Sequence, residues 1–140
     1  MNYTDYMAEK NQLIICGLPP VKDTAHKVLM VILQRTLWHN KLGEYIPREI
    51  YHEGFYDGSY TIPPLEENDA YISRALLHLE SIGLIQRINK GMKRHSWVAV
   101  SFKMLDSLIK RKEELVNMYK ESHIRKKEDF YIMERTDFSE

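Results

Sequence analysis

Residues 72–85, ISRALLHLESIGLI, decide the fold predicted for this chain. Apolar side chains recur in this stretch at the spacing of an amphipathic helix, at Ile72, Ala75, Leu76, Leu79 and Ile82. Asn68 is a good N-cap ahead of them, and Gly83 stands where a residue in the left-handed conformation ends a helix. We therefore expect a helix over residues 68–81 with one buried and one exposed face.

Two short strands are expected after this helix, over residues 84–88 and 96–100. The connector, residues 89–94, is basic and contains Gly91, which can adopt a positive φ. The pattern predicts a β-hairpin with a positively charged tip. The strand after it leads into a stretch without proline or glycine that runs to the end of the sequence.

Two further helices are expected before residue 68. Asp23 or Thr24 offers an N-cap for a largely apolar, central helix that ends near Trp38. Pro47 suits the first position of a brief helix over residues 47–53, and Tyr45-Ile46 can form a short strand before it. Asp57-Gly58 predicts a small hairpin that joins residues 55–56 to residues 59–60.

This order of helix, helix, loop, helix and basic hairpin is that of a winged helix. The expected fold class is therefore mainly α with a small β-hairpin wing, a winged helix-turn-helix followed by a long C-terminal helix. We expect three regions: an N-terminal arm over residues 1–20, extended or in a short strand, the winged-helix domain over residues 21–100, and the C-terminal helix over residues 101–140.

The C-terminal helix has an apolar seam, because seven of ten positions taken in alternating steps of three and four from Phe102 are apolar. This seam either folds back on its own domain or pairs with a second copy, and a frayed tail is the third possibility. In a homodimer, the expected contact residues are Phe102, Leu105, Ile109, Val116 and Tyr119.

The zero net charge of the 140 residues is an average over unlike segments. Residues 1–83 contain 7 basic and 11 acidic side chains, residues 84–112 contain 8 and 1, and residues 113–140 contain 5 and 8. Local charge decides whether a surface attracts phosphates, so a net charge of zero does not count against a nucleic-acid partner.

Several function classes are disfavoured by what the sequence lacks. It has no glycine-rich phosphate loop, no nucleophile elbow and no histidine pair at metal-binding spacing, so we expect neither an enzyme nor a bound metal or other cofactor. Cys16 is the only cysteine, which fits a reducing, cytoplasmic compartment. The longest apolar run, residues 28–33, is too short to cross a membrane.

A helix that reads DNA must bury one stripe and present polar side chains to the major groove. Arg74 can bind guanine or a phosphate, Asn68 can bind adenine or cap the helix, and Asp69 repels phosphates unless it accepts a hydrogen bond from cytosine. The candidate recognition residues are Asn68, Asp69, Ala70, Tyr71, Ser73, Arg74 and His78. The candidate wing residues, expected on phosphates, are Lys90, Lys93, Arg94 and His95.

Residues 36–41, TLWHNK, with Tyr45-Ile46 and residues 72–85, resemble the N-terminal domain of phage replication initiators of the O-protein type. They also resemble the wider group of MarR-like winged-helix repressors. The resemblance implies binding to double-stranded DNA at a replication origin of a phage or mobile element, with replication proteins as further partners. It places DNA contacts at Asn68, Asp69, Ala70, Tyr71 and Arg74, but Asp69 and Tyr71 depart from the family pattern, so the base preference does not transfer.

Two alternatives to origin recognition stay open at this point. The first is a transcriptional repressor of the MarR-like type, which would bind an operator. The second is a winged helix that serves as a protein–protein interaction module and does not need the charges of the wing.

Overall fold

The computed structural model describes residues 2–56, 58, 60–88 and 97–137, and for residues 125–137 it describes the backbone alone. Within these residues the helices are α1 (Tyr3–Ile15), α2 (Asp23–Arg35), α3 (Arg48–Glu53), α4 (Asp69–Ser81) and α5 (Phe102–Asp137), with a 3₁₀ turn over Leu37–His39. The strands are β1 (Gly43–Tyr45), β2 (Phe55–Tyr56), β3 (Thr61–Ile62), β4 (Ile85–Ile88) and β5 (Trp97–Val100).

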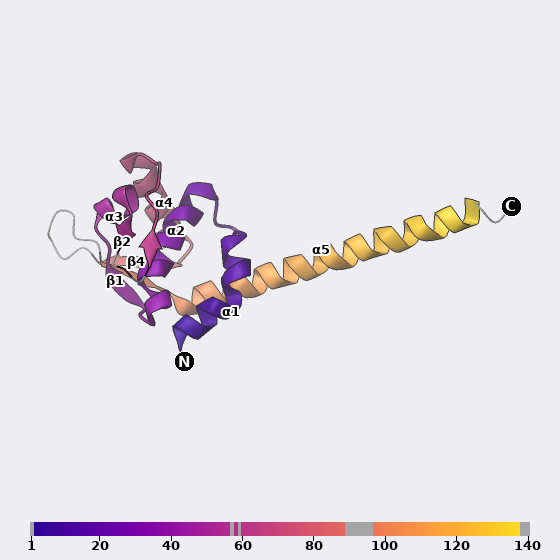
Figure 1. Ribbon diagram of the computed structural model, residues 1–140, viewed down its shortest axis with the longest axis horizontal. Helices are drawn as coiled ribbons and strands as arrows, with labels where there is room; N and C mark the ends of the chain where they lie inside the picture. Colours follow the sequence, from indigo (N-terminus) through magenta and orange to yellow (C-terminus); the bar gives the residue numbers. More distant parts are fainter. Residues whose placement is uncertain (1, 57, 59, 89–96, 138–140) are drawn as a thin grey trace.

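The predicted fold class is confirmed: the protein is mainly helical, with a small antiparallel sheet and a long C-terminal helix (Figure 1). The sheet has the order β1-β5-β4, and Val98 of β5 lies between Glu44 of β1 and Arg87 of β4. The order α2, β1, α3, α4, β4, β5 is the one expected of a winged helix. Strands β4 and β5 form the stem of the expected wing.

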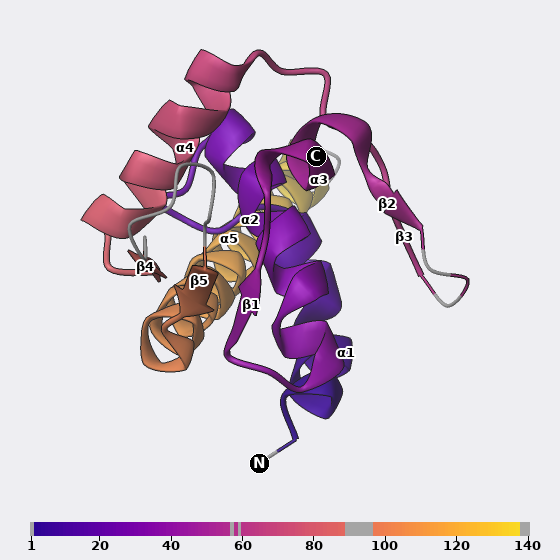
Figure 2. The ribbon, with the colours of Figure 1, turned by 90° about the vertical axis from the view of Figure 1, so that its left-hand side faces the viewer.

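Helix α2 is the centre of the core. Its residues Val28, Leu29, Ile32 and Leu33 are fully buried, and α4 packs along it (Figure 2). The helix stops at Arg35, three residues earlier than expected. The buried Thr36 hydroxyl donates to the Ile32 carbonyl oxygen at 2.7 Å, and the chain continues into the 3₁₀ turn.

The N-terminal segment is a helix and not the extended arm that we expected. Asn2 caps α1, since its side-chain oxygen accepts a hydrogen bond from the Thr4 backbone amide at 2.9 Å. Met7 and Ile14, seven residues apart on one helical face, are fully buried in the common core. The Tyr6 hydroxyl donates to the Asp106 carboxylate of α5 at 2.8 Å, so the first and last helices are joined.

The segment between α3 and α4 is a hairpin with a different register from the predicted one. Residues Phe55 and Tyr56 pair with Ile62 and Thr61, and not with residues 59–60. Gly54 makes this geometry possible, because it has φ +78° and a Cβ there would lie 2.4 Å from the Ile62 carbonyl oxygen.

Helix α5 begins inside the domain and then extends away from it (Figure 1). Leu105 and Ile109 are fully buried, and the Phe102 ring packs 4.7 Å from the Tyr6 ring of α1, measured between centroids. The first part of the seam therefore folds back on its own domain, and the expectation that Leu105 and Ile109 face a second copy is wrong. Val116 is half-buried and Tyr119 is 71% exposed.

Candidate nucleic-acid interface

Helix α4 lies at the outer edge of the domain with one face uncovered (Figure 2). Ile72, Ala75, Leu76 and Leu79 are buried, and α2 covers this side of the helix. The opposite stripe is made of small or polar side chains with one arginine and one leucine: Ala70, Ser73, Arg74, Leu77 and Ser81. Ser73 is half-buried and the other four residues are exposed, so their side chains can meet a large partner.

Asn68 caps the start of α4. Its side-chain oxygen accepts a hydrogen bond from the Tyr71 backbone amide at 3.0 Å. Of the two roles considered for Asn68, capping is the one that the structure shows. The side chain therefore stabilises the end of the helix that would enter a DNA groove.

Asp69 is engaged by two residues of α3. Its Oδ1 atom lies 3.0 Å from Arg48 Nη1 and 3.2 Å from His52 Nε2. The hydrogen bond with His52 and the positive charge of Arg48 hold the pKa of the Asp69 carboxyl below its ordinary value of 3.8. These contacts offset the negative charge that we expected to repel phosphates, and they tie both ends of α3 to the first turn of α4.

Tyr71, Arg74 and His78 lie along one edge of α4, beside the first turn of α2. The Arg74 guanidinium carbon is 5.6 Å from the centroid of the Tyr71 ring. Together with Lys22, the three residues line a shallow hollow of about 290 Å³. His78 Nε2 is buried and has no hydrogen-bond partner in the described part of the chain. This edge can therefore offer an aromatic face, two cations and an imidazole, next to one carboxylate, Asp23.

The wing is described only at its stem. Ile88 of β4 pairs with Trp97 of β5, and both side chains are partly exposed at the end of the stem that leads to the tip. Arg87 does not point freely outward, because its Nε atom donates to Glu80 of α4 at 2.7 Å. The predicted tip residues lie outside the described residues: Lys90, Lys93, Arg94 and His95.

The structure brings more residues to this surface than the sequence indicated. All seven candidates on α4 lie on or beside its uncovered face, whereas Lys22, Arg48 and His52 were not expected there. The sequence gives no signal for the Arg48–Asp69 contact, because the two residues are separated by the β2–β3 hairpin. Successive side chains of a strand point to opposite faces of the sheet, and this alternation could have identified Ile88 and Trp97 as exposed apolar residues.

The described residues contain neither a metal-binding cluster nor a membrane-spanning helix. Among them, no cluster of three or more histidine, cysteine or carboxylate side chains is arranged to hold a metal ion. None of the helices, over the residues searched, combines the length and apolar character needed to cross a membrane.

Comparison of the chain with models of known protein families, with curated proteins and with solved structures finds no match.

Proposed function

We propose that this protein binds double-stranded DNA, with α4 in the major groove and the wing against the sugar-phosphate backbone. The observation that carries the proposal is the uncovered face of α4, a capped helix whose outward stripe consists mostly of small and polar side chains around Arg74. An α-helix with its side chains is about 10–12 Å wide, which matches a major groove of about 12 Å. Small residues such as Ala70 and Ser73 permit a close approach.

The distribution of charge supports the same proposal. Arg74 and Lys22 lie beside the uncovered face and outnumber the one carboxylate of the same hollow, Asp23. Asp69 is offset by Arg48 and His52. The sequence between Leu84 and Trp97 contains no acidic residue. Besides Arg87, it contains three basic residues: Lys90, Lys93 and Arg94. Such a grouping attracts phosphates even in a chain without net charge.

The biological role that we propose is recognition of a replication origin in a phage or mobile element. The resemblance of residues 36–41, 45–46 and 72–85 to O-type initiators supports this role. Replication proteins would then be further partners. A MarR-like repressor would use the same surface, and only the position of the bound sites separates the two roles.

The first test is selection from a pool of random duplex DNA at two salt concentrations. The full chain is compared with a Lys93/Arg94→Ala variant and with a Lys103/Arg111→Ala variant, which removes the same charges from exposed positions on α5. We expect an enriched motif, and weaker binding with a shallower salt slope for the wing variant alone, because each phosphate contact contributes about 0.9 to the slope. Absence of duplex binding by all three proteins at low salt would reject the proposal.

Footprinting on the native genome then separates the roles. Repeated sites at an origin support initiation, and a site that overlaps a promoter supports repression. A protein that binds no duplex but keeps its biological role after loss of the wing charges would be a protein–protein interaction module.

A further inference from the structure

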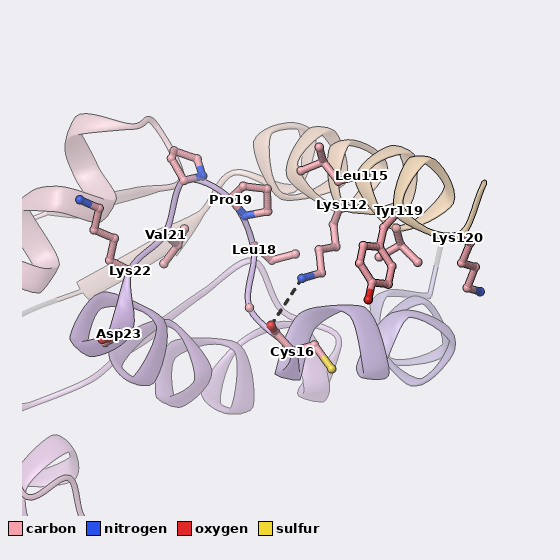
Figure 3. A pocket seen from close by; sticks show the side chains of 13 residues that line it. Cys16, Leu18, Pro19, Val21, Lys22, Asp23, Lys112, Leu115, Tyr119 and Lys120 are labelled. Atoms are coloured by element: carbon pink, nitrogen blue, oxygen red, sulfur yellow. Dashed lines mark hydrogen bonds between the residues drawn. The ribbon is translucent and has the colours of Figure 1, made fainter. Parts of the chain in front are cut away.

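A groove separates the loop before α2 from the part of α5 that leaves the domain. Its volume is about 790 Å³ (Figure 3). Pro19 and Val21 line it on the loop side, and Leu115, Val116 and Tyr119 line it on α5. Lys112 lies at its inner end, where its Nζ atom is 3.5 Å from the Cys16 carbonyl oxygen. The groove is therefore largely apolar along its length, and three cations, Lys22, Lys112 and Lys120, line it with one carboxylate, Asp23.

The helix continues beyond this groove without support from its own domain (Figure 1). Met118, Tyr119 and Ile124 are 64%, 71% and 54% exposed. Isolated helices are only marginally stable in water, and stable ones bury an apolar face against a partner. Beyond Lys120, which lies at the end of the groove, the described part of the chain places no other element against the backbone of α5.

The sequence of α5 selects the direction in which two copies can pair. In the seam, Lys112, Tyr119, Lys126 and Met133 occupy one of the two core positions of each heptad, and Val116, His123 and Phe130 occupy the other. A parallel, in-register pair places Lys112 against Lys112 and Lys126 against Lys126, which is unfavourable.

An antiparallel pair matches apolar positions with one another and Lys112 with a carboxylate. It places Val116 against Met133, Tyr119 against Phe130, and Lys112 against Asp137. His123 faces Lys126 in the layer nearest the two-fold axis, so this pair keeps one polar layer but has no Lys112–Lys112 or Lys126–Lys126 layer. The overall charges agree, since residues 128–140 contain five acidic side chains and one basic side chain. The groove on the other copy is lined by three lysines and one carboxylate, Asp23. Opposite charges across an interface fix register and orientation.

We propose that α5 is an antiparallel self-association element, in which the end of α5 from a second copy occupies the groove between α5 and the loop before α2. Phe130 and Met133 of the second copy pack on Tyr119 and Val116, and Asp137 of the second copy pairs with Lys112. The arrangement is symmetric, so two grooves are filled in each dimer. It does not depend on the proposed DNA binding.

Sedimentation equilibrium of the full chain tests the association, with variants that reverse the charges at positions 112 and 137 singly and together. The wild-type mass should approach twice 16.7 kDa. Lys112→Glu and Asp137→Lys should each raise the dissociation constant by about fivefold or more, because each creates two like-charge contacts per dimer. The combined variant should recover wild-type association, and Lys103→Glu, an exposed change on the first turn of α5, should have no effect. Circular dichroism checks that each variant is folded.

A monomeric wild-type chain, or a combined variant no better than the single variants, would overturn the proposal. Cysteine pairing gives an independent measure of direction. In a Cys16→Ser background, Val116→Cys and Met133→Cys together should yield a disulfide-linked dimer, whereas either change alone should not. The two positions are about 25 Å apart along one helix, so they cannot join within a chain. A linked dimer from Val116→Cys alone would show parallel pairing and contradict the proposal. DNA binding by a monomeric chain would leave the proposed function standing while this inference fails.

Discussion

Arg48 Nη1 lies 3.0 Å from Asp69 Oδ1, and this ion pair joins the first residue of α3 to the first residue of α4. The same Arg48 atom also donates to the Asp69 backbone carbonyl at 3.3 Å. The two helices are separated along the chain by the β2–β3 hairpin. The ion pair therefore fixes the start of α4 against α3, although a long segment connects the two helices.

Replacement of Asp69 by asparagine should strengthen DNA binding by about twofold to fivefold. The change removes a negative charge near the expected phosphates and releases Arg48, while an exposed ion pair contributes at most about 1 kcal/mol to stability. Fluorescence anisotropy with the selected duplex measures the effect. Glu66→Gln is the matched control, because it removes one charge from an exposed residue nearby. A tenfold loss of affinity, with a changed preference at one base pair, would mean that Asp69 contacts a base.

Gly54→Ala should destabilise the protein by about 2–3 kcal/mol, since a side chain at φ +78° is strained and its Cβ would lie 2.4 Å from the Ile62 carbonyl oxygen. Gly58→Ala separates the backbone strain from the steric clash, because Gly58 also has a positive φ but a Cβ there would meet nothing within 4 Å. It should therefore cost less stability than Gly54→Ala. Urea denaturation of both variants measures the difference. Equal losses would show that the close approach between Gly54 and β3 is absent in solution.

Tyr6→Phe should cost about 1 kcal/mol of unfolding free energy, because it removes the hydrogen bond to the Asp106 carboxylate. Burial, followed by this hydrogen bond, raises the pKa of the Tyr6 hydroxyl, so the phenol stays protonated and remains a donor at neutral pH. Tyr3→Phe is the control, since the Tyr3 ring also packs on Phe102 but is not bonded to Asp106. An unchanged stability of Tyr6→Phe would show that α1 is not held on α5 by this contact.

Stability should fall as the pH is lowered from 7 towards 5, in part because of His26. Burial lowers the pKa of this imidazole in the folded protein below its ordinary value of 6.5. Below pH 6.5 the unfolded chain therefore binds a proton that the folded chain does not, and acid favours unfolding. Thermal unfolding of His26→Gln across this range should show a weaker pH dependence than the wild type, and an unchanged pH dependence would contradict this role of His26.

Elements that depend on local sequence were predictable. The helix α4 follows from its apolar spacing, from the Asn68 cap and from Gly83, which adopts φ +78°. The hairpin of β4 and β5 follows from two short apolar strands around a basic connector. In both cases the information lies within about fifteen neighbouring residues.

Features that depend on distant contacts were not predictable from one sequence. Leu13-Ile14-Ile15 resembles a short strand, yet α1 is stabilised by Met7 in the core and by the contact of Tyr6 with Asp106. The seam of α5 was visible as a pattern, but only the structure shows that Leu105 and Ile109 contact their own domain. A repeating apolar spacing specifies a buried face and does not specify what covers it.

The most direct test of the proposed DNA binding is a comparison of Arg74→Ala with Arg111→Ala on the duplex selected from the random pool. Both changes remove one exposed arginine, the first from the uncovered face of α4 and the second from α5. If α4 enters the major groove, Arg74→Ala should lower the affinity by about 1–3 kcal/mol in binding free energy, and Arg111→Ala should change it less than about twofold. Equal affinities of the two variants and the wild type would contradict the account.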